Sequence, residues 1–249
     1  MVAEPGKSKA LYAFEQKLIY FYDDIEMMDV IRTSVIRGDL SNDKSKFLLK
    51  GVNQDKHAHL ARRANSKGGR VNTINHLRAS VYSSFIKDLY EEVTDYLKVV
   101  LLQASKNSFD SGRIIGEHGF KIDSKHVLSL GGWPEVCQYI TESVFQALES
   151  ERSTLNLLKK MCAKLGLIVE EKHFDTALPY LEVRHFLVHA DGRLSEEYRA
   201  KYPVIKHKGG MVVLDYDFIV AAYKSVLALV QAFDKEVVGK KVLMPADLR

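Results

Sequence analysis

Apolar residues recur every three or four positions along most of this chain, which places them on one face of an α-helix. The first such stretch runs from Ser8 to Arg37, with apolar residues at Leu11, Phe14, Leu18, Phe21, Ile25, Met28 and Ile31. A longer stretch runs from His76 to Lys106, with apolar residues at Leu77, Val81, Phe85, Leu89, Val93, Tyr96, Leu97 and Val100. The first pattern predicts an amphipathic helix or a pair of helices, and the second predicts one long helix that is the first core helix of a bundle.

Two intervals lose this spacing and contain several glycines. From Gly38 to Asn75 the spacing breaks at Gly51, Gly68 and Gly69, so we predict a linker with short helices. From Asn107 to Gly132, five glycines surround short β-compatible runs such as residues 113–115. This second interval predicts a long irregular insertion.

The second half of the chain predicts three further helices. Trp133-Pro134 suits a helix start, because proline is favoured at the first helical position. Another helix is expected from Ser153 to Leu165, where Gly166 stops it. Pro179 is expected to open the helix after that, with residues 173–176 as its approach.

A hairpin and a last helix complete the prediction. Gly209-Gly210 separates two short β-prone runs, 204–208 and 211–214, which is a two-residue hairpin signal. Asp215 or Asp217 can cap the following helix, because an aspartate side chain accepts hydrogen bonds from the first helical turn. We therefore predict an all-α protein with a small β-hairpin near the C-terminus.

The composition fits one folded protein of this kind. The chain has 249 residues, of which 46% are hydrophobic and 27% charged, enough for one core with an appended helical region. We place the appended N-terminal helical region at 1–71 and the helical domain at 72–249. The net charge of +4 mildly favours polyanionic partners.

Cysteine usage and the N-terminus indicate a cytoplasmic protein. Cys137 and Cys162 give neither a zinc-ligand spacing nor a disulfide framework. The first residues contain no apolar signal core, and no apolar run approaches the 18 residues that a membrane span requires. We expect no membrane partner.

The hexapeptide Arg184-His185-Phe186-Leu187-Val188-His189 is the candidate for chemistry. Cleavage of RNA through its own ribose needs a base for the 2′-hydroxyl proton and a cation for the charge that grows on the phosphate. Histidine titrates near neutral pH and arginine keeps its charge, so the two can supply both functions. This chemistry requires no metal ion and no other cofactor.

The spacing of these residues indicates how they act together. Arg184 and His189 are five positions apart, so on a straight helix their side chains point about 140° away from each other. Two copies meeting at a twofold axis would bring both kinds of side chain into one cleft, which predicts a homodimer. His185 and His189 share one helix face, so His185 is a candidate to orient the phosphate or His189.

The motif resembles the Arg-x4-His signature of the HEPN superfamily, the higher eukaryote and prokaryote nucleotide-binding domain. Residues 181–194 look like that family's helix end and turn. The family most often has asparagine after the arginine, where this chain has His185. The resemblance extends from about Asn72 to Val238.

The resemblance implies a helical bundle that dimerises and cuts RNA without a metal ion, with Arg184, His185 and His189 as catalytic residues. It also implies a role in phage defence or in a toxin system, with structured RNA such as tRNA as target and an antitoxin or defence-system protein as partner. Two alternatives remain open. One is a catalytically silent helical module that binds RNA, nucleotide or a protein, and the other is a regulatory partner that a nucleotidyltransferase modifies.

Other interpretations of the motif are structural. Histidine in a last helical turn is favoured by the helix dipole, and Gly192 resembles a helix cap, so the motif could simply terminate a helix. His185 and His189 could share a zinc ion, but no third ligand is evident, and we assign no metal site.

Basic residues supply the candidate contacts with RNA. Lys56, Arg62 and Arg63 lie in a stretch of the predicted linker with few acidic residues. Such a stretch is either a solvated helix face or a contact for the RNA backbone. Together with Arg193, which follows the motif, these are the expected RNA-binding residues.

Overall fold

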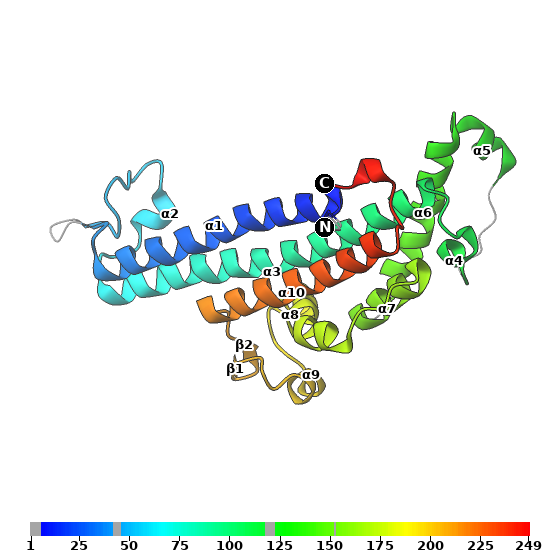
Figure 1. The fold of residues 1–249 in the computed structure, drawn as a ribbon. Helices are drawn as coiled ribbons and strands as arrows, with labels where there is room; N and C mark the ends of the chain where they lie inside the picture. Colours follow the sequence, from blue (N-terminus) through cyan, green and yellow to red (C-terminus); the bar gives the residue numbers. More distant parts are fainter. Residues whose placement is uncertain (1–5, 42–45, 118–122, 152) are drawn as a thin grey trace.

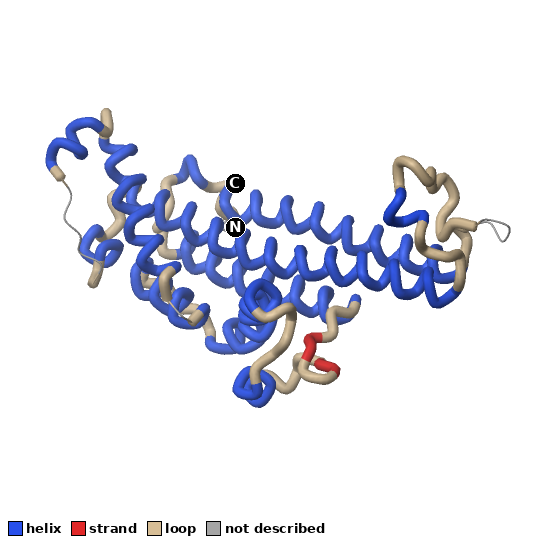
Figure 2. The backbone as a smooth tube through the Cα atoms, turned by 180° about the vertical axis from the view of Figure 1, so that it is seen from behind, coloured by secondary structure: helices blue, strands red, loops and turns tan. Residues whose placement is uncertain are grey.

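The computed structural model is built almost entirely from helices (Figure 1, and seen from behind in Figure 2). It describes residues 6–41, 46–117, 123–151 and 153–249. The long helices α1 (Lys9–Arg37) and α3 (Lys67–Lys106) run antiparallel, side by side, and α10 (Tyr216–Gly239) packs against both. The all-α class with a small hairpin is thereby confirmed.

α1 is one continuous helix, which decides between the single helix and the pair of helices that its apolar spacing allows. The Ser8 hydroxyl caps it by accepting a hydrogen bond from the Leu11 N–H at 2.9 Å. Gly38 ends it with a φ of +90°, a left-handed conformation that glycine adopts without steric cost. The buried face of the helix packs along α3.

A buried polar cluster joins α1, α3 and α10. The Asp234 carboxylate accepts hydrogen bonds from the Ser8 N–H at 3.0 Å, from the Tyr96 hydroxyl at 3.0 Å and from the Ser8 hydroxyl. All three residues are buried. Burial and the nearby carboxylate raise the pKa of Tyr96, so this phenol stays a neutral donor. The cluster satisfies a carboxylate that has lost its hydration.

α3 starts earlier than predicted. It begins at Lys67 rather than at His76, and Gly68 and Gly69 lie in its first turn instead of breaking it. The Ser66 hydroxyl caps the helix by accepting from the Gly69 N–H at 3.1 Å. The expected boundary between 1–71 and 72–249 therefore falls inside this helix. Before it, the linker contains only the short α2 (Ala58–Ala61) among its described residues.

The glycine-rich interval after α3 contains two short helices, α4 (Ser111–Ile115) and α5 (Ser124–Ser129), which corrects the prediction of an irregular insertion. Residues 113–115 are helical rather than β-like, because the Asp110 carboxylate caps the turn by accepting from the Arg113 N–H at 3.1 Å. Part of the interval, residues 118–122, lies outside the described residues.

α6 (Trp133–Glu149) begins where the sequence predicts, and α7 (Thr154–Leu165) matches the predicted helix to within one residue, with Ser153 as its cap. Gly166 terminates α7 with a φ of +65°. The buried ammonium of Lys164 on α7 donates to the carbonyl oxygens of Ile114 and Ile115, at 2.7 and 2.9 Å. These bonds attach the end of α4 to α7.

α8 (Glu171–His189) carries the motif, and its start differs from the prediction. Pro179 lies in the interior of the helix rather than at its first position. Proline has no N–H and interrupts the helical hydrogen-bond ladder. Side chains on either side of it are buried, among them Phe174, Ala177, Leu178, Tyr180, Leu181 and Val183. Core packing therefore holds the helix together through the proline.

The last elements match the sequence pattern. After α9 (Glu196–Lys201), β1 (His207–Lys208) and β2 (Met211–Val212) form an antiparallel hairpin around Gly209-Gly210. Asp215 caps α10 by accepting from the Phe218 N–H at 2.8 Å. The short 3₁₀-helix η1 (Pro245–Asp247) lies near the chain end.

α10 is, within the described residues, the one helix that is long and apolar enough to cross a membrane by length and composition. Its apolar side chains pack against α8, α1 and α3. The buried ones include Phe218, Ala222, Val226, Leu229 and Phe233. These contacts make α10 part of the core that it shares with α1, α3 and α8.

Candidate functional site

The last turns of α8 leave the core and expose two histidines. His185, Val188 and His189 are exposed, whereas Val183 just before them is buried. The ring centroids of His185 and His189 lie 5.0 Å apart, as their spacing of four positions predicts. The two imidazoles form an adjacent pair on the surface.

Arg184 points away from this pair and into a pocket. Its guanidinium carbon lies 5.1 Å from the ring centroid of Tyr90 on α3, a cation–π contact. Its Nε is buried without a hydrogen-bond partner. Arg184 and His185 line the pocket, whereas His189 does not. Within one chain the arginine and His189 are therefore separated, as the helix geometry predicts.

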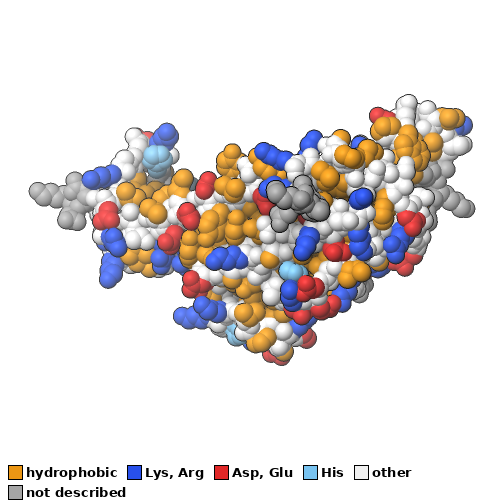
Figure 3. Space-filling model, viewed as in Figure 1, with side chains coloured by type: hydrophobic (Ala, Val, Ile, Leu, Met, Phe, Trp, Pro, Cys, Tyr) orange, Lys and Arg blue, Asp and Glu red, His pale blue; other side chains and the backbone are white. Residues whose placement is uncertain are grey.

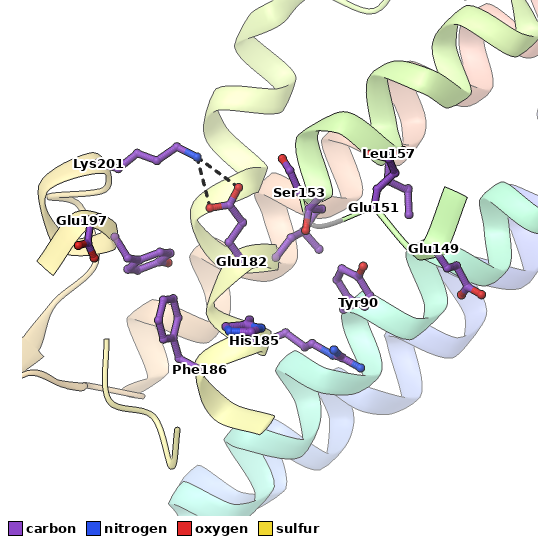
Figure 4. A pocket seen from close by; sticks show the side chains of 14 residues that line it. Tyr90, Glu149, Glu151, Ser153, Leu157, Glu182, His185, Phe186, Glu197 and Lys201 are labelled. Carbon is purple, nitrogen blue, oxygen red and sulfur yellow. Dashed lines mark hydrogen bonds and ion pairs between the residues drawn. The ribbon is translucent and has the colours of Figure 1, made fainter. Parts of the chain in front are cut away.

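The pocket has a volume of about 480 Å³ and lies between α3, α8, α9 and the junction of α6 with α7 (Figure 4). Aromatic rings of Tyr90, Phe186 and Tyr198 contribute to its lining. Burial raises the pKa of both Tyr90 and Tyr198, so these phenols remain neutral. The Tyr198 hydroxyl donates to the Pro179 carbonyl oxygen and so connects α9 to α8.

Carboxylates outnumber cations in this pocket. The acidic lining residues are Glu149, Glu151, Glu182 and Glu197, against Arg184 and Lys201. Two of the carboxylates are paired, Glu182 with Lys201 at 3.3 Å (Figure 4) and Glu151 with Lys160 at 2.6 Å. Hydrogen bonds from its own backbone and from Ser195 lower the pKa of Glu197, which keeps that carboxylate charged. The interior of the pocket therefore favours a positive group over a phosphate.

The predicted RNA-binding residues are not all near the motif. Lys56, Arg62 and Arg63 are exposed around α2, which lies at the far end of the α1–α3 pair (Figure 1). Arg193 is exposed just after the motif, and its backbone bridges to Met211 of β2. The structure thus brings one of the four to the motif and leaves three at a distance.

A second hollow, of about 780 Å³, lies between α3, the turn after α8 and the hairpin. Its basic residues, Arg78 and Lys87, are not among the residues predicted to bind RNA. A signal was present, because His76, Ser80, Ser83, Ser84 and Lys87 follow helical spacing and form a polar stripe along α3. We call this hollow the α3–hairpin groove.

Comparison with known proteins found no family model, no curated protein and no solved structure that matches this chain. Among the described residues, no three His, Cys, Asp or Glu side chains are grouped to hold a metal ion. The chemistry of the site is therefore the basis for a function.

Proposed function

We propose that this protein is a metal-independent endoribonuclease of the HEPN type. His189 accepts the 2′-hydroxyl proton of RNA, the freed oxygen attacks the adjacent phosphorus, and Arg184 stabilises the charge of the phosphorane. The bond from phosphorus to the 5′-oxygen breaks, and His189 of a second copy protonates that leaving oxygen. The products carry 2′,3′-cyclic phosphate and 5′-hydroxyl ends.

One observation carries this proposal: an exposed pair of imidazoles lies on the same end of α8 as Arg184, which has no ion-pair partner among the described residues. His185, with its ring centroid 5.0 Å from that of His189, is placed to orient the base. Tyr90 supports the guanidinium through its ring face, which leaves the N–H groups of Arg184 available for phosphate oxygens.

The proposed dimer forms through the exposed end of α8. Val188, 43% exposed, lies between the two histidines on the same end of the helix and supplies an apolar contact. Exposed apolar side chains also gather along α1, including Tyr20, Met27 and Val30 (Figure 3). Since α1 lies on the side of α3 away from α8 (Figure 1), a dimer through α1 would not join the two sets of catalytic residues.

The biological setting follows from the family resemblance. As a member of the HEPN group, the protein would act in phage defence or in a toxin–antitoxin system, in the cytoplasm, on structured RNA such as tRNA. An antitoxin or a defence-system protein would then be its partner.

The test is cleavage of total RNA by the purified protein in excess EDTA, followed by end-group analysis. Arg184→Ala and His189→Ala should each lower the cleavage rate by about 10² to 10⁴. His126→Ala on α5 is the matched control, because His126 stacks on Tyr139 far from α8 and its loss should leave the rate unchanged. Equal cleavage by all four proteins, or cleavage that requires a metal ion, would contradict the proposal.

A second candidate is a catalytically silent module that binds a protein partner. The excess of carboxylates around Arg184 favours it, because such a pocket attracts a lysine or arginine side chain of a partner. In that case Glu149→Gln and Glu197→Gln should weaken partner binding, and no form of the protein should cleave RNA. Faster cleavage by the same two variants would instead support the nuclease, since less negative charge would then oppose the phosphate.

A further inference from the structure

The α3–hairpin groove has two unlike walls. The α3 wall presents hydroxyl and basic groups at Ser80, Ser83, Ser84, Arg78 and Lys87. The facing wall is apolar and comes from the end of α8 and the hairpin region, with Leu187, Met211, Val212 and Leu214. Because the serine side chains on α3 are small and fill little of the space, a hollow of about 780 Å³ remains between the two walls. A ligand that fits must be polar on one side and apolar on the other.

The two basic residues of α3 in this groove are not paired with a carboxylate of the described chain. Neither Arg78 nor Lys87 forms an ion pair among the described residues. The Arg78 guanidinium lies over the Tyr82 ring, 5.8 Å from its centroid, and its buried Nε has no hydrogen-bond partner. A buried N–H donor without an acceptor is costly, and an anionic ligand would satisfy it.

The nearby carboxylates are few. Asp191 lines the groove directly, and Asp88 accepts a hydrogen bond from Ser84 at 3.2 Å. Asp215, at the foot of the hairpin, is within 3.6 Å of Lys206. Arg193 and Lys208 add exposed positive charge beside the hairpin strands. The balance is the reverse of that in the pocket around Arg184, where carboxylates dominate.

We propose that the α3–hairpin groove binds a single-stranded segment of the RNA substrate, which rests on the proposed nuclease function. The phosphates contact Arg78, Lys87 and the serine hydroxyls of α3, because such groups make most backbone contacts in nucleic-acid complexes. The base faces lie against the apolar wall, which tolerates any base. The groove therefore positions the strand without reading its sequence.

The groove also borders the end of α8 that carries the histidines, since Leu187 lines it. The turn at Asp191 and Gly192, which follows His189 after one intervening residue, is part of its lining. Both residues have positive φ, 49° and 81°, so the chain reverses sharply there. A strand that leaves the groove around this turn arrives at the exposed His185–His189 pair. This path brings the RNA to the histidines from the side of α8 that carries Arg193.

The test measures binding separately from cleavage. A short fluorescent single-stranded oligoribonucleotide is titrated with the His189→Ala protein, and then with Arg78→Gln and Lys87→Gln added singly to that background. Each change should raise the dissociation constant several-fold and lower the slope of log K against log salt by about 0.7 for each phosphate that is no longer neutralised. Thermal unfolding of each variant shows whether the fold is retained.

Two further variants test whether the affinity for RNA depends on the sign and the place of the charge that is removed. Asp191→Asn should tighten binding, and asparagine tolerates the left-handed backbone at this position as well as aspartate does. Lys125→Gln on α5 is the matched control, with the same loss of charge at the other end of the molecule (Figure 1). It should leave the dissociation constant unchanged.

The outcomes separate the groove from the catalytic assignment. Weaker binding by the two α3 variants, with cleavage unaffected by His189→Ala, would keep the groove and refute the catalytic residues. Unchanged binding by Arg78→Gln, Lys87→Gln and Asp191→Asn would overturn the groove. It would also be overturned if a mononucleotide or inorganic phosphate displaced the oligonucleotide at equal concentration, or if only an amphipathic helical peptide bound there.

Discussion

The two ends of α8 are in opposite environments. In its first half, Phe174 meets Phe233 of α10 with ring centroids 6.0 Å apart, and Tyr180 meets Phe218 at 5.3 Å. At the other end the side chains of His185 and His189 are exposed and pack on each other. One rigid helix is thus anchored by its buried half and presents chemistry at its free end. A group held in this way keeps its position without contributing to the core.

The largest expected effect on stability is at the anchored half. Phe174→Ala should lower the free energy of unfolding by about 3–5 kcal/mol, because it removes a buried ring and leaves a cavity against α10. Urea unfolding followed by circular dichroism measures it. Ile168→Ala is the matched control, since Ile168 is 76% exposed and should change stability by less than about 0.5 kcal/mol. Similar losses of unfolding free energy for Phe174→Ala and Ile168→Ala would refute the idea that the buried first half of α8 anchors the helix.

A smaller effect is expected at the junction of α8 with α9. The buried Tyr198 hydroxyl donates to the Pro179 carbonyl oxygen, so Tyr198→Phe should cost about 1–2 kcal/mol in the same unfolding measurement. Tyr82→Phe is its control, because the Tyr82 hydroxyl is equally buried but has no hydrogen-bond partner. Removing that hydroxyl should leave stability unchanged or raise it. A larger loss for Tyr82→Phe would show that α9 is not held to α8 in this way.

The pH dependence near the anchored end has a definite sign. Burial raises the pKa of the Cys162 thiol on α7 to about 12, from an ordinary value of 9.0. The folded chain therefore keeps a proton that the unfolded chain loses, so this contribution to stability is full below about pH 9 and declines as the pH rises toward 12. Cys162→Ala should flatten the alkaline decline in the free energy of unfolding. An identical decline in the variant would contradict the raised pKa of this partly buried thiol.

The local spacing of residues predicts the fold well where one element decides its own structure. The helix over Lys9–Arg37, the stop at Gly166 and the hairpin at Gly209-Gly210 all follow from short patterns. Prediction fails where tertiary contacts override local preference. Pro179 is tolerated inside α8 because its neighbours are buried, and Gly69 suits the start of α3 because a Cβ there would lie 2.6 Å from the Ala64 carbonyl oxygen.

In the candidate site, too, features within one helix can be predicted from the sequence, whereas features that depend on other elements cannot. The pairing of His185 with His189, and the divergence of Arg184 from His189, follow from helix periodicity. The Tyr90 ring beneath Arg184 and the carboxylates around it come from other elements, so the spacing within α8 gives no indication of them. The sequence therefore predicts which groups are present but not the sign of the charge around each one.

The smallest expected effect on stability is at the exposed end, and it distinguishes two interpretations of the motif. If the histidines only terminate α8, His189→Lys places a cation at the helix end, which the helix dipole favours, and should change neither stability nor cleavage. If His189 is the base, the same substitution should abolish RNA cleavage while the free energy of unfolding changes by less than about 0.5 kcal/mol. Unfolding and cleavage measured on one preparation decide between them. Retained cleavage would leave the exposed pair with a structural role and would make the acidic pocket the more informative surface.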